Sequence, residues 1–221
     1  MLITSCFCLS FLSQSVSAKD FDLKVYSEGP EQYPCLPNTI HHSLTNLGTE
    51  KTIPIALDRI NVYCFIYIAY EQEPEFLWVD KTIPLTSPEP SRPTLFKSKQ
   101  TASNSVTLFW HPESMIFDRI GKWTVRVVWH GPTSKVSSEL VQIVIKKPDV
   151  DNQIALKMLK DKNSIPALWG PNWKLSENKN LIKSWSQLAL EIIERHPSSA
   201  YTKRLKEILA IETSSSAISK E

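Results

Sequence analysis

The stretch Gly121-Lys-Trp-Thr-Val-Arg-Val-Val-Trp-His130 decides the fold class of this chain. From Trp123 to Trp129 every second residue is large and apolar, and the residues between them are mostly polar. A period of two is typical of a β-strand that buries one face. The segment 140–145 resumes an apolar run after a break at 131–134, so the two segments predict a β-hairpin with a longer loop.

Shorter strands are expected on the N-terminal side of this hairpin. Residues 62–70 are apolar on both faces, which is typical of a central strand, and we expect Cys64, Ile66 and Ile68 to face the core. Further candidates lie at residues 23–26, 39–45, 53–57, 76–80, 93–96 and 106–110. About seven to nine short strands with no helical run among them predict an antiparallel, immunoglobulin-like β-sandwich.

The apolar pattern changes to a helical period at Pro148. Asp151 can cap a first short helix, a second helix is expected from Ser176 to a stop at His196, and a third starts at Ser198. The predicted chain is mainly β with C-terminal α structure. It has a sandwich at 19–147, two or three helices within 148–211 and a flexible tail at 212–221.

The first eighteen residues are expected to be a signal peptide. They carry no charge, and an apolar run is followed by Val16-Ser-Ala18, which resembles a cleavage site. We therefore expect a secreted or periplasmic protein. Ile3-Thr-Ser-Cys6 also resembles a lipoprotein processing box, so attachment to the envelope or a membrane by a lipid, or peripherally, is a second possibility.

Two cysteines, Cys35 and Cys64, remain once the leader is removed. A single pair in an exported protein usually forms a bridge, so these residues are our candidate disulfide. The alternative is a pair of buried free thiols.

Two segments carry a resemblance to known families. Residues 118–129 followed by 138–145 resemble the last strand pair of immunoglobulin-like or fibronectin-type domains in exported bacterial proteins. Residues 189–201 are similar to the junction between helices in tetratricopeptide-like repeats, although such a segment occurs once here and a solenoid needs about three. The resemblance implies a fold, a compartment and an interaction role, and it implies no catalytic residue.

Composition excludes several classes of function. The chain has 25 Lys and Arg against 23 Asp and Glu, a net charge of +2, which argues against a nucleic-acid partner. Its five glycines are isolated, so no glycine-rich phosphate loop can form and we expect no cofactor. The histidines lack zinc-site spacing, so we expect no metal.

Aromatic residues and histidines supply the candidate binding surface. In two Trp-His pairs the histidines, His111 and His130, stand just beyond expected strand ends. Two tryptophans that flank a Gly-Pro connector could wedge the helices onto the sandwich. The candidate surface consists of Trp78, Trp110, His111, His130, Trp169 and Trp173. Packing in the core or between domains is the alternative role for the tryptophans.

Three functions remain open at this point. The first is a non-catalytic exported module that binds a protein or cell-envelope component. The second is a carbohydrate-binding module, which requires Tyr67, Trp78 and Trp110 to be exposed on one sheet face. The third is a hydrolase, which requires either a carboxylate pair or a cluster of histidines. Its candidates are Glu71, Glu73 and Glu75 for the carboxylates and His41, His111 and His130 for the cluster.

Overall fold

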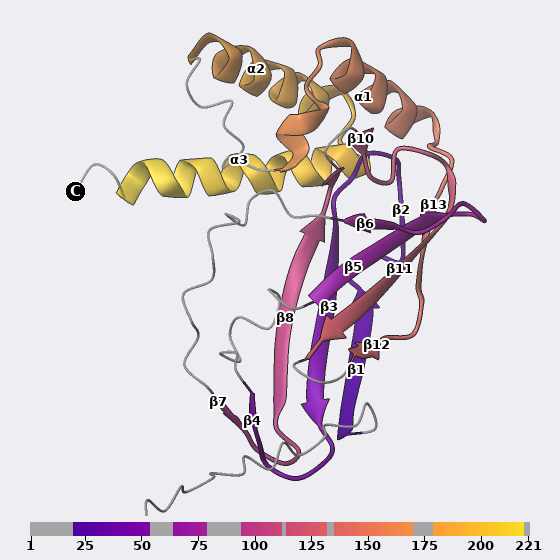
Figure 1. Ribbon diagram of the computed structural model, residues 1–221. Helices are drawn as coiled ribbons and strands as arrows, with labels where there is room; N and C mark the ends of the chain where they lie inside the picture. Colours follow the sequence, from indigo (N-terminus) through magenta and orange to yellow (C-terminus); the bar gives the residue numbers. More distant parts are fainter. Residues whose placement is uncertain are drawn as a thin grey trace, which may run out of the picture.

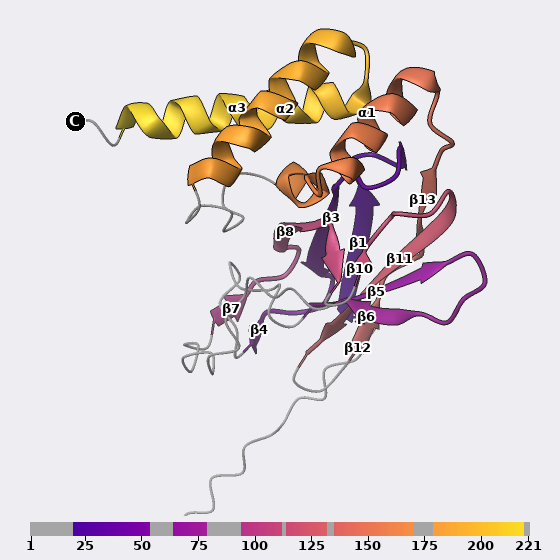
Figure 2. The same cartoon turned by 90° about the horizontal axis from the view of Figure 1, so that it is seen from above.

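A computed structural model describes residues 20–53, 64–78, 94–111, 114–131, 135–169 and 179–218. Two β-sheets pack face to face, and the helices gather at one end of this sandwich (Figures 1 and 2). This architecture confirms the predicted class, which is a β-sandwich followed by C-terminal helices.

The smaller sheet contains three antiparallel strands in the order β1 (Phe21–Ser27), β3 (Asn38–Asn46) and β8 (Thr101–Leu108). Its register places Leu23 opposite Leu44, and Leu44 opposite Ala102. Side chains of β3 alternate between buried and partly exposed along its whole length. The sheet therefore has one core face and one outer face, as the period of two requires.

The larger sheet is built around β11 (Gly121–His130), the strand that contains the deciding stretch. On one side of β11 lie β13 (Val141–Ile145) and β2 (Glu31–Gln32), and β2 runs parallel to β13. On the other side lie β5 (Cys64–Tyr70) and β6 (Phe76–Trp78), both antiparallel to their neighbours. Three smaller pairings complete the described strands: β12 (Lys135–Ser137) with β11, β4 (Lys51–Ile53) with β7 (Thr94–Phe96), and β9 (Trp110–His111) with β10 (Ser114–Met115).

The core between the sheets follows the predicted phase. Trp123, Val125, Val127 and Trp129 are all almost fully buried, and so are Ile66 and Ile68 of β5. The ring of Phe21 lies 4.9 Å from that of Trp129, so aromatic side chains join the two sheets across the core.

The described helices are α1 (Val150–Asp161), the short 3-10 helix η3 (Ile165–Trp169), α2 (Lys179–Arg195) and α3 (Ala200–Ile218). The N-cap of α1 is Asp149 and not Asp151 as predicted, because the Asp149 carboxylate accepts the backbone N–H of Asn152. Helix α3 continues to Ile218, into the stretch expected to be a flexible tail, and no glycine or proline interrupts it. None of the described helices is long and apolar enough to cross a membrane.

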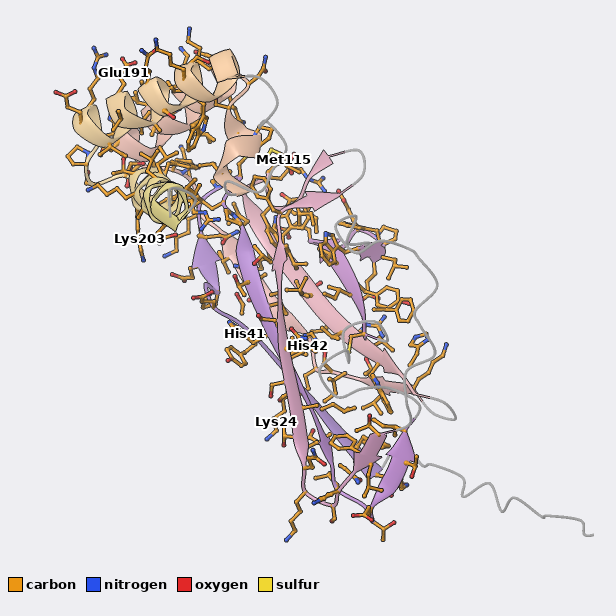
Figure 3. The ribbon with its side chains drawn as sticks, turned by 90° about the vertical axis from the view of Figure 1, so that its left-hand side faces the viewer. Lys24, His41, His42, Met115, Glu191 and Lys203 are labelled. Carbon is orange, nitrogen blue, oxygen red and sulfur yellow. The ribbon has the colours of Figure 1, made fainter. Side chains whose placement is uncertain are left out.

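A second hydrophobic core joins the helices to the end of the sandwich. This core contains Leu159 of α1, Ile192 of α2 and Leu205 of α3. It also contains Phe109 and Cys35, which come from loops of the sandwich. Met115 of β10 packs against the same cluster and lies beside the helices in Figure 3. The helical segment is therefore docked on the sandwich through shared apolar contacts.

Candidate binding groove between the sandwich and the third helix

The predicted disulfide between Cys35 and Cys64 is wrong, because both residues are free cysteines. Cys35 belongs to the helical core, whereas Cys64 packs against the core between the sheets. A disulfide needs Cβ atoms about 3.8 Å apart, and residues of two separate cores do not meet this requirement. Burial raises the pKa of Cys35 to about 11 and that of Cys64 to about 12.

Of the candidate aromatic surface, the structure describes the side chains of Trp78 and His130. Trp78 is 7 % exposed and belongs to the core between the sheets, so its assignment to a binding surface is wrong. The backbones of Trp110 and His111 form β9, and that of Trp169 ends η3, while their side chains lie outside the description. Trp173 lies outside the described residues.

The described histidines do not converge on one site. His41 lies on the outer face of the smaller sheet, where its ring stacks on Tyr26 at 4.7 Å. His130 lies on the outer face of the larger sheet, where its ring contacts Phe65 at 4.4 Å. Among the described residues, no three His, Cys, Asp or Glu side chains gather as metal ligands would.

The three alternating carboxylates after β5 bind neighbouring basic and backbone groups. Glu73 accepts two hydrogen bonds from Arg119, at 2.7 and 2.8 Å, and these bonds lower the pKa of Glu73. Glu75 forms a two-bond pair with Arg126, and Glu71 accepts the backbone N–H of Lys122 at 2.9 Å. Each carboxylate thus binds a different partner on or beside β11. The alternating positions of Glu71, Glu73 and Glu75 therefore reflect three separate contacts across the sheet.

Aromatic rings on the outer face of the larger sheet are covered on at least one side. On that face the guanidinium of Arg126 lies 5.0 Å from the centre of the Tyr67 ring. Tyr70 lies on the core side of β5, where its ring packs against Trp123, and the guanidinium of Arg119 lies 3.9 Å from its centre. The contact of Arg126 with Tyr67 occupies a ring face that a sugar would use for stacking. Tyr67 and Trp78 therefore do not form the open aromatic row that a carbohydrate site requires.

Asp, His and Ser side chains meet where the three helices join, although not as a catalytic triad. Asp151 Oδ1 lies 2.6 Å from His196 Nδ1, and Asp151 Oδ2 accepts the hydroxyl of Ser198. In a triad the histidine lies between the serine and the acid. Here the carboxylate lies between the other two groups, so the contact connects the start of α1 to the α2–α3 turn.

A groove runs along the first turns of α3 where the helix crosses the end of the smaller sheet. It consists of two adjoining cavities, of about 420 and 360 Å³, which share Tyr33, Ala200 and Lys203. The larger cavity is bounded by the turn after β1, by β3 and β8, and by α3. Its polar lining residues include Glu28, Gln32, Asn38, Thr39, Thr107 and Arg204. The smaller cavity lies at the start of α3 and is lined by residues that include Asp149, Asn152, Ser198 and Lys206.

Polar groups in the groove are held by defined contacts. Asn38 is 2 % exposed and donates to Gly29 O at 2.7 Å and to Gln32 Oε1 at 3.0 Å. Arg204 donates through Nε to Leu168 O at 2.9 Å. Lys203 and Lys206 are exposed, and neither forms an ion pair with a described residue. The groove therefore combines a fixed polar wall with ammonium groups that are available to a ligand.

Tyr201 fixes the position of α3 over the groove. Its side chain is fully buried, and its hydroxyl donates to Pro34 O at 2.6 Å. Cys35, the next residue, has a φ of 63° and donates its N–H to Phe117 O, and Phe117 has a φ of 61°. Left-handed conformations at buried non-glycine residues are held only by their surroundings, so this junction is tightly determined.

Sequence reasoning missed this groove. Its walls come from residues 28–39, Thr107 and the 149–207 region, and no motif connects these segments. The available signal is the helical spacing of Tyr201, Leu205 and Ile208, which indicates an apolar side of the third helix but does not identify what it packs against.

No protein-family model matches the sequence, and no curated protein matches it. The sporulation control protein Spo0M from Bacillus subtilis is similar at 7 % identity over 64 % of this chain and 55 % of that chain, with a TM-score of 0.36. The CARDB domain of the PF1109 protein from Pyrococcus furiosus is similar at 10 % identity over 57 % of this chain and 90 % of that domain, with a TM-score of 0.31. A β-glucosidase from Listeria innocua is similar at 12 % identity over 57 % of this chain and 16 % of the enzyme, with a TM-score of 0.30.

Proposed function

We propose that this chain is a non-catalytic binding module that receives a segment of a protein or cell-envelope component in the groove beside α3. The observation that carries the proposal is the pair of adjoining cavities, about 420 and 360 Å³, between the sandwich and the helix. Cavities of roughly 300–1,000 Å³ are typical of ligand sites at domain junctions.

The lining of the groove favours an extended peptide that carries an acidic side chain. Thr39, Thr107 and Gln32 offer hydrogen-bonding groups along one wall. Of the carboxylates in the lining, Glu31 pairs with Lys146, Glu207 pairs with Arg204, and Asp149 caps α1. Lys203 and Lys206 form no ion pair with a described residue, so they offer two positive charges near the start of α3. A peptide backbone needs donors and acceptors along its length, and a carboxylate gains from the ammonium groups.

The positions of the histidines and carboxylates that a hydrolase would need support a non-catalytic role. His41 and His130 lie on the outer faces of different sheets, and Glu71, Glu73 and Glu75 each bind a separate partner. Catalysis needs a nucleophile or a base within reach of a common point. We therefore propose binding in preference to hydrolysis.

Export is part of the proposal. The segment 1–18, which suggests a signal peptide, lies outside the described residues. We propose a secreted or periplasmic location, with attachment to the envelope if Cys6 is lipidated, and a relationship to exported immunoglobulin-like domains. Mass spectrometry of the N-terminus of protein purified from the envelope and the medium tests this; a chain that keeps residues 1–18 would contradict it.

Binding of defined peptides tests the groove. An array of extended peptides with acidic, neutral or basic side chains is probed with the full chain, and affinities of the best binders are measured by fluorescence anisotropy. We expect acidic peptides to bind and the double variant Lys203→Glu/Lys206→Glu to weaken them about tenfold or more, through charge repulsion.

Lys24→Glu is the matched control, because Lys24 is an exposed lysine on the outer face of the smaller sheet, away from the groove (Figure 3). Lys24→Glu changes the net charge by half as much as the double variant does. The matched comparison is therefore between Lys24→Glu and the single variant Lys203→Glu. Equal weakening by Lys24→Glu and Lys203→Glu, or no preference for acidic peptides, would contradict the proposed site.

A further inference from the structure

The outer edge of β8 has backbone groups directed away from the sheet. Asn46 donates its N–H to Gln100 O at 3.0 Å, whereas Glu28 donates to Thr39 O at 2.9 Å. Because hydrogen bonding alternates along an antiparallel pair, even residues of β3 face β8 and odd residues face β1. By the same alternation the odd residues of β8 direct their N–H and C=O groups to the outer edge. These are Thr101, Ser103, Ser105 and Thr107.

The outer edge of β8 lacks the charged side chains and the short length that protect the other sheet edges. In the smaller sheet the opposite edge, β1, carries Asp22 and Lys24. In the larger sheet the edge strand β2 has only two residues, and the described part of β6 has three. Strand β8 has eight residues with no charge and no proline, and within the described chain it pairs with β3 alone. Long, uncharged edges accept another strand.

The sequence of β8 is almost a palindrome. Thr-Ala-Ser-Asn-Ser-Val-Thr reads the same way around Asn104, except that alanine stands opposite valine. If two copies pair antiparallel around Asn104, Thr101 meets Thr107, Ser103 meets Ser105, and Ala102 meets Val106 of the other copy. A two-fold interface must be complementary to itself, and this sequence meets that requirement residue by residue.

We propose that two copies of this chain associate through antiparallel pairing of their β8 strands, which joins the two three-stranded sheets into one continuous sheet. Each outward pair exchanges two backbone hydrogen bonds. In the single chain the Ser105 N–H is held by the Asn104 side chain at 2.6 Å, and it exchanges this local acceptor for a carbonyl of the second copy.

Side chains on the outer face suit such a pairing. Thr101 already contacts Thr45 through hydroxyls 2.9 Å apart, and Thr107 contacts Thr39 at 3.3 Å. The same kind of Thr–Thr and Ser–Ser contact recurs across the new interface. The two-fold axis stands perpendicular to the sheet, so both outer faces point the same way. Thr107 also lines the groove, so the two grooves of the pair would lie on one side.

Molar mass measured by light scattering after size exclusion, over a concentration series reaching the upper micromolar range, tests the proposal. For the wild type we expect twice the molar mass of one chain, which is 25.2 kDa for the full sequence and less once residues 1–18 are removed. The variant Ser103→Lys/Ser105→Lys should be monomeric, because four ammonium groups then meet at the interface. Ser43→Lys, on the same face of the central strand β3, is the control and should remain dimeric.

A variant of opposite charge distinguishes a loss of association from poor folding of the lysine variant. The variant Ser103→Glu/Ser105→Glu should also be monomeric alone and should form a heterodimer when mixed with the lysine variant. A wild type that is monomeric throughout, or a lysine variant that stays dimeric, would overturn the proposal. Peptide affinities of the lysine variant, measured separately, show whether the groove works independently of association.

Discussion

At the scale of single residues, two adjacent histidines of β3 differ in burial because neighbouring side chains of a strand point to opposite faces of the sheet. His41 is partly exposed and stacks on Tyr26, whereas His42 is 2 % exposed and points into the core (Figure 3). Neither ring nitrogen of His42 has a hydrogen-bond partner among the described residues. A buried polar group without a partner costs free energy, so His42 destabilises the fold at its position.

We predict that His42→Leu raises the free energy of unfolding by about 1–3 kcal/mol at neutral pH, because the substitution removes unsatisfied buried nitrogens. Burial, and to a smaller extent the charge of His41, lowers the pKa of His42 below its ordinary value of 6.5. The unfolded chain therefore takes up more protons as the pH falls below 6.5, and the wild type loses stability there.

The variant should lack this part of the acid dependence. Urea unfolding at a series of pH values measures both effects, and His41→Leu is the matched control on the outer face. A parallel pH dependence in wild type and His42→Leu would contradict the prediction.

We predict that both described cysteines resist modification in the native protein. The thiolate is the reactive form, and burial raises the pKa of Cys35 to about 11 and of Cys64 to about 12. Iodoacetamide labelling at neutral pH, read by peptide mass spectrometry, should modify them only after urea is added. Rapid labelling of either residue in the folded protein would show that its thiol is accessible.

At the scale of elements, the helices are held by contacts that their own patterns do not show. Asp151 lies in the first turn of α1, and the sequence pattern suggested it as a cap. Asp149 takes that role instead, and Asp151 binds His196 and Ser198 from the α2–α3 turn. Asp149 and Asp151 are separated by one position, and only the path of the later helices separates their roles.

We predict that Asp151→Asn lowers the melting temperature at neutral pH. Hydrogen bonds from Ser198 and His196 lower the pKa of Asp151 below its ordinary value of 3.8. The stabilisation is therefore present above 3.8 and is lost as the pH falls through the lowered pKa. Thermal unfolding at several acidic pH values should show the two proteins converging.

Glu191→Gln is the control for that experiment, because Glu191 forms an exposed ion pair with Arg195 within α2. A difference between wild type and Asp151→Asn that stays constant down to strongly acidic pH would contradict the assigned role.

We predict that Tyr201→Phe lowers the free energy of unfolding by about 1–3 kcal/mol, because the buried carbonyl of Pro34 loses its donor. Guanidinium unfolding followed by circular dichroism measures the change. Tyr26→Phe, at a ring that is 61 % exposed, should have almost no effect. An equal effect of both substitutions would show that the hydroxyl of Tyr201 does not anchor α3.

At the scale of the whole molecule, one core lies between the sheets and another joins the helices to the end of the sandwich. Phe109 is 1 % exposed and belongs to the second core, although it directly follows β8. The segment that ends a sheet strand therefore supplies part of the surface on which the helices dock. The groove exists because this docking leaves space beside the first turns of α3.

We predict that Phe109→Ala lowers the free energy of unfolding by about 3–5 kcal/mol and shifts the loss of helix and the exposure of tryptophan together, because the side chain joins helices and sandwich. Circular dichroism and tryptophan fluorescence across one denaturant titration measure both. Leu190→Ala, at a helix residue that is 57 % exposed, is the control and should shift neither. Loss of helix without any shift in fluorescence would contradict a shared core.

The sequence by itself determined the sandwich, the helical end and the buried phase of β11, because alternation and helical spacing are local properties that each segment carries alone. It did not determine that Trp78 is buried or that Cys35 and Cys64 lie in different cores. Tertiary structure decided these points and built the groove, where Tyr201 reaches a carbonyl 167 positions away. Contacts at such separation depend on how whole elements pack, and no local period records them.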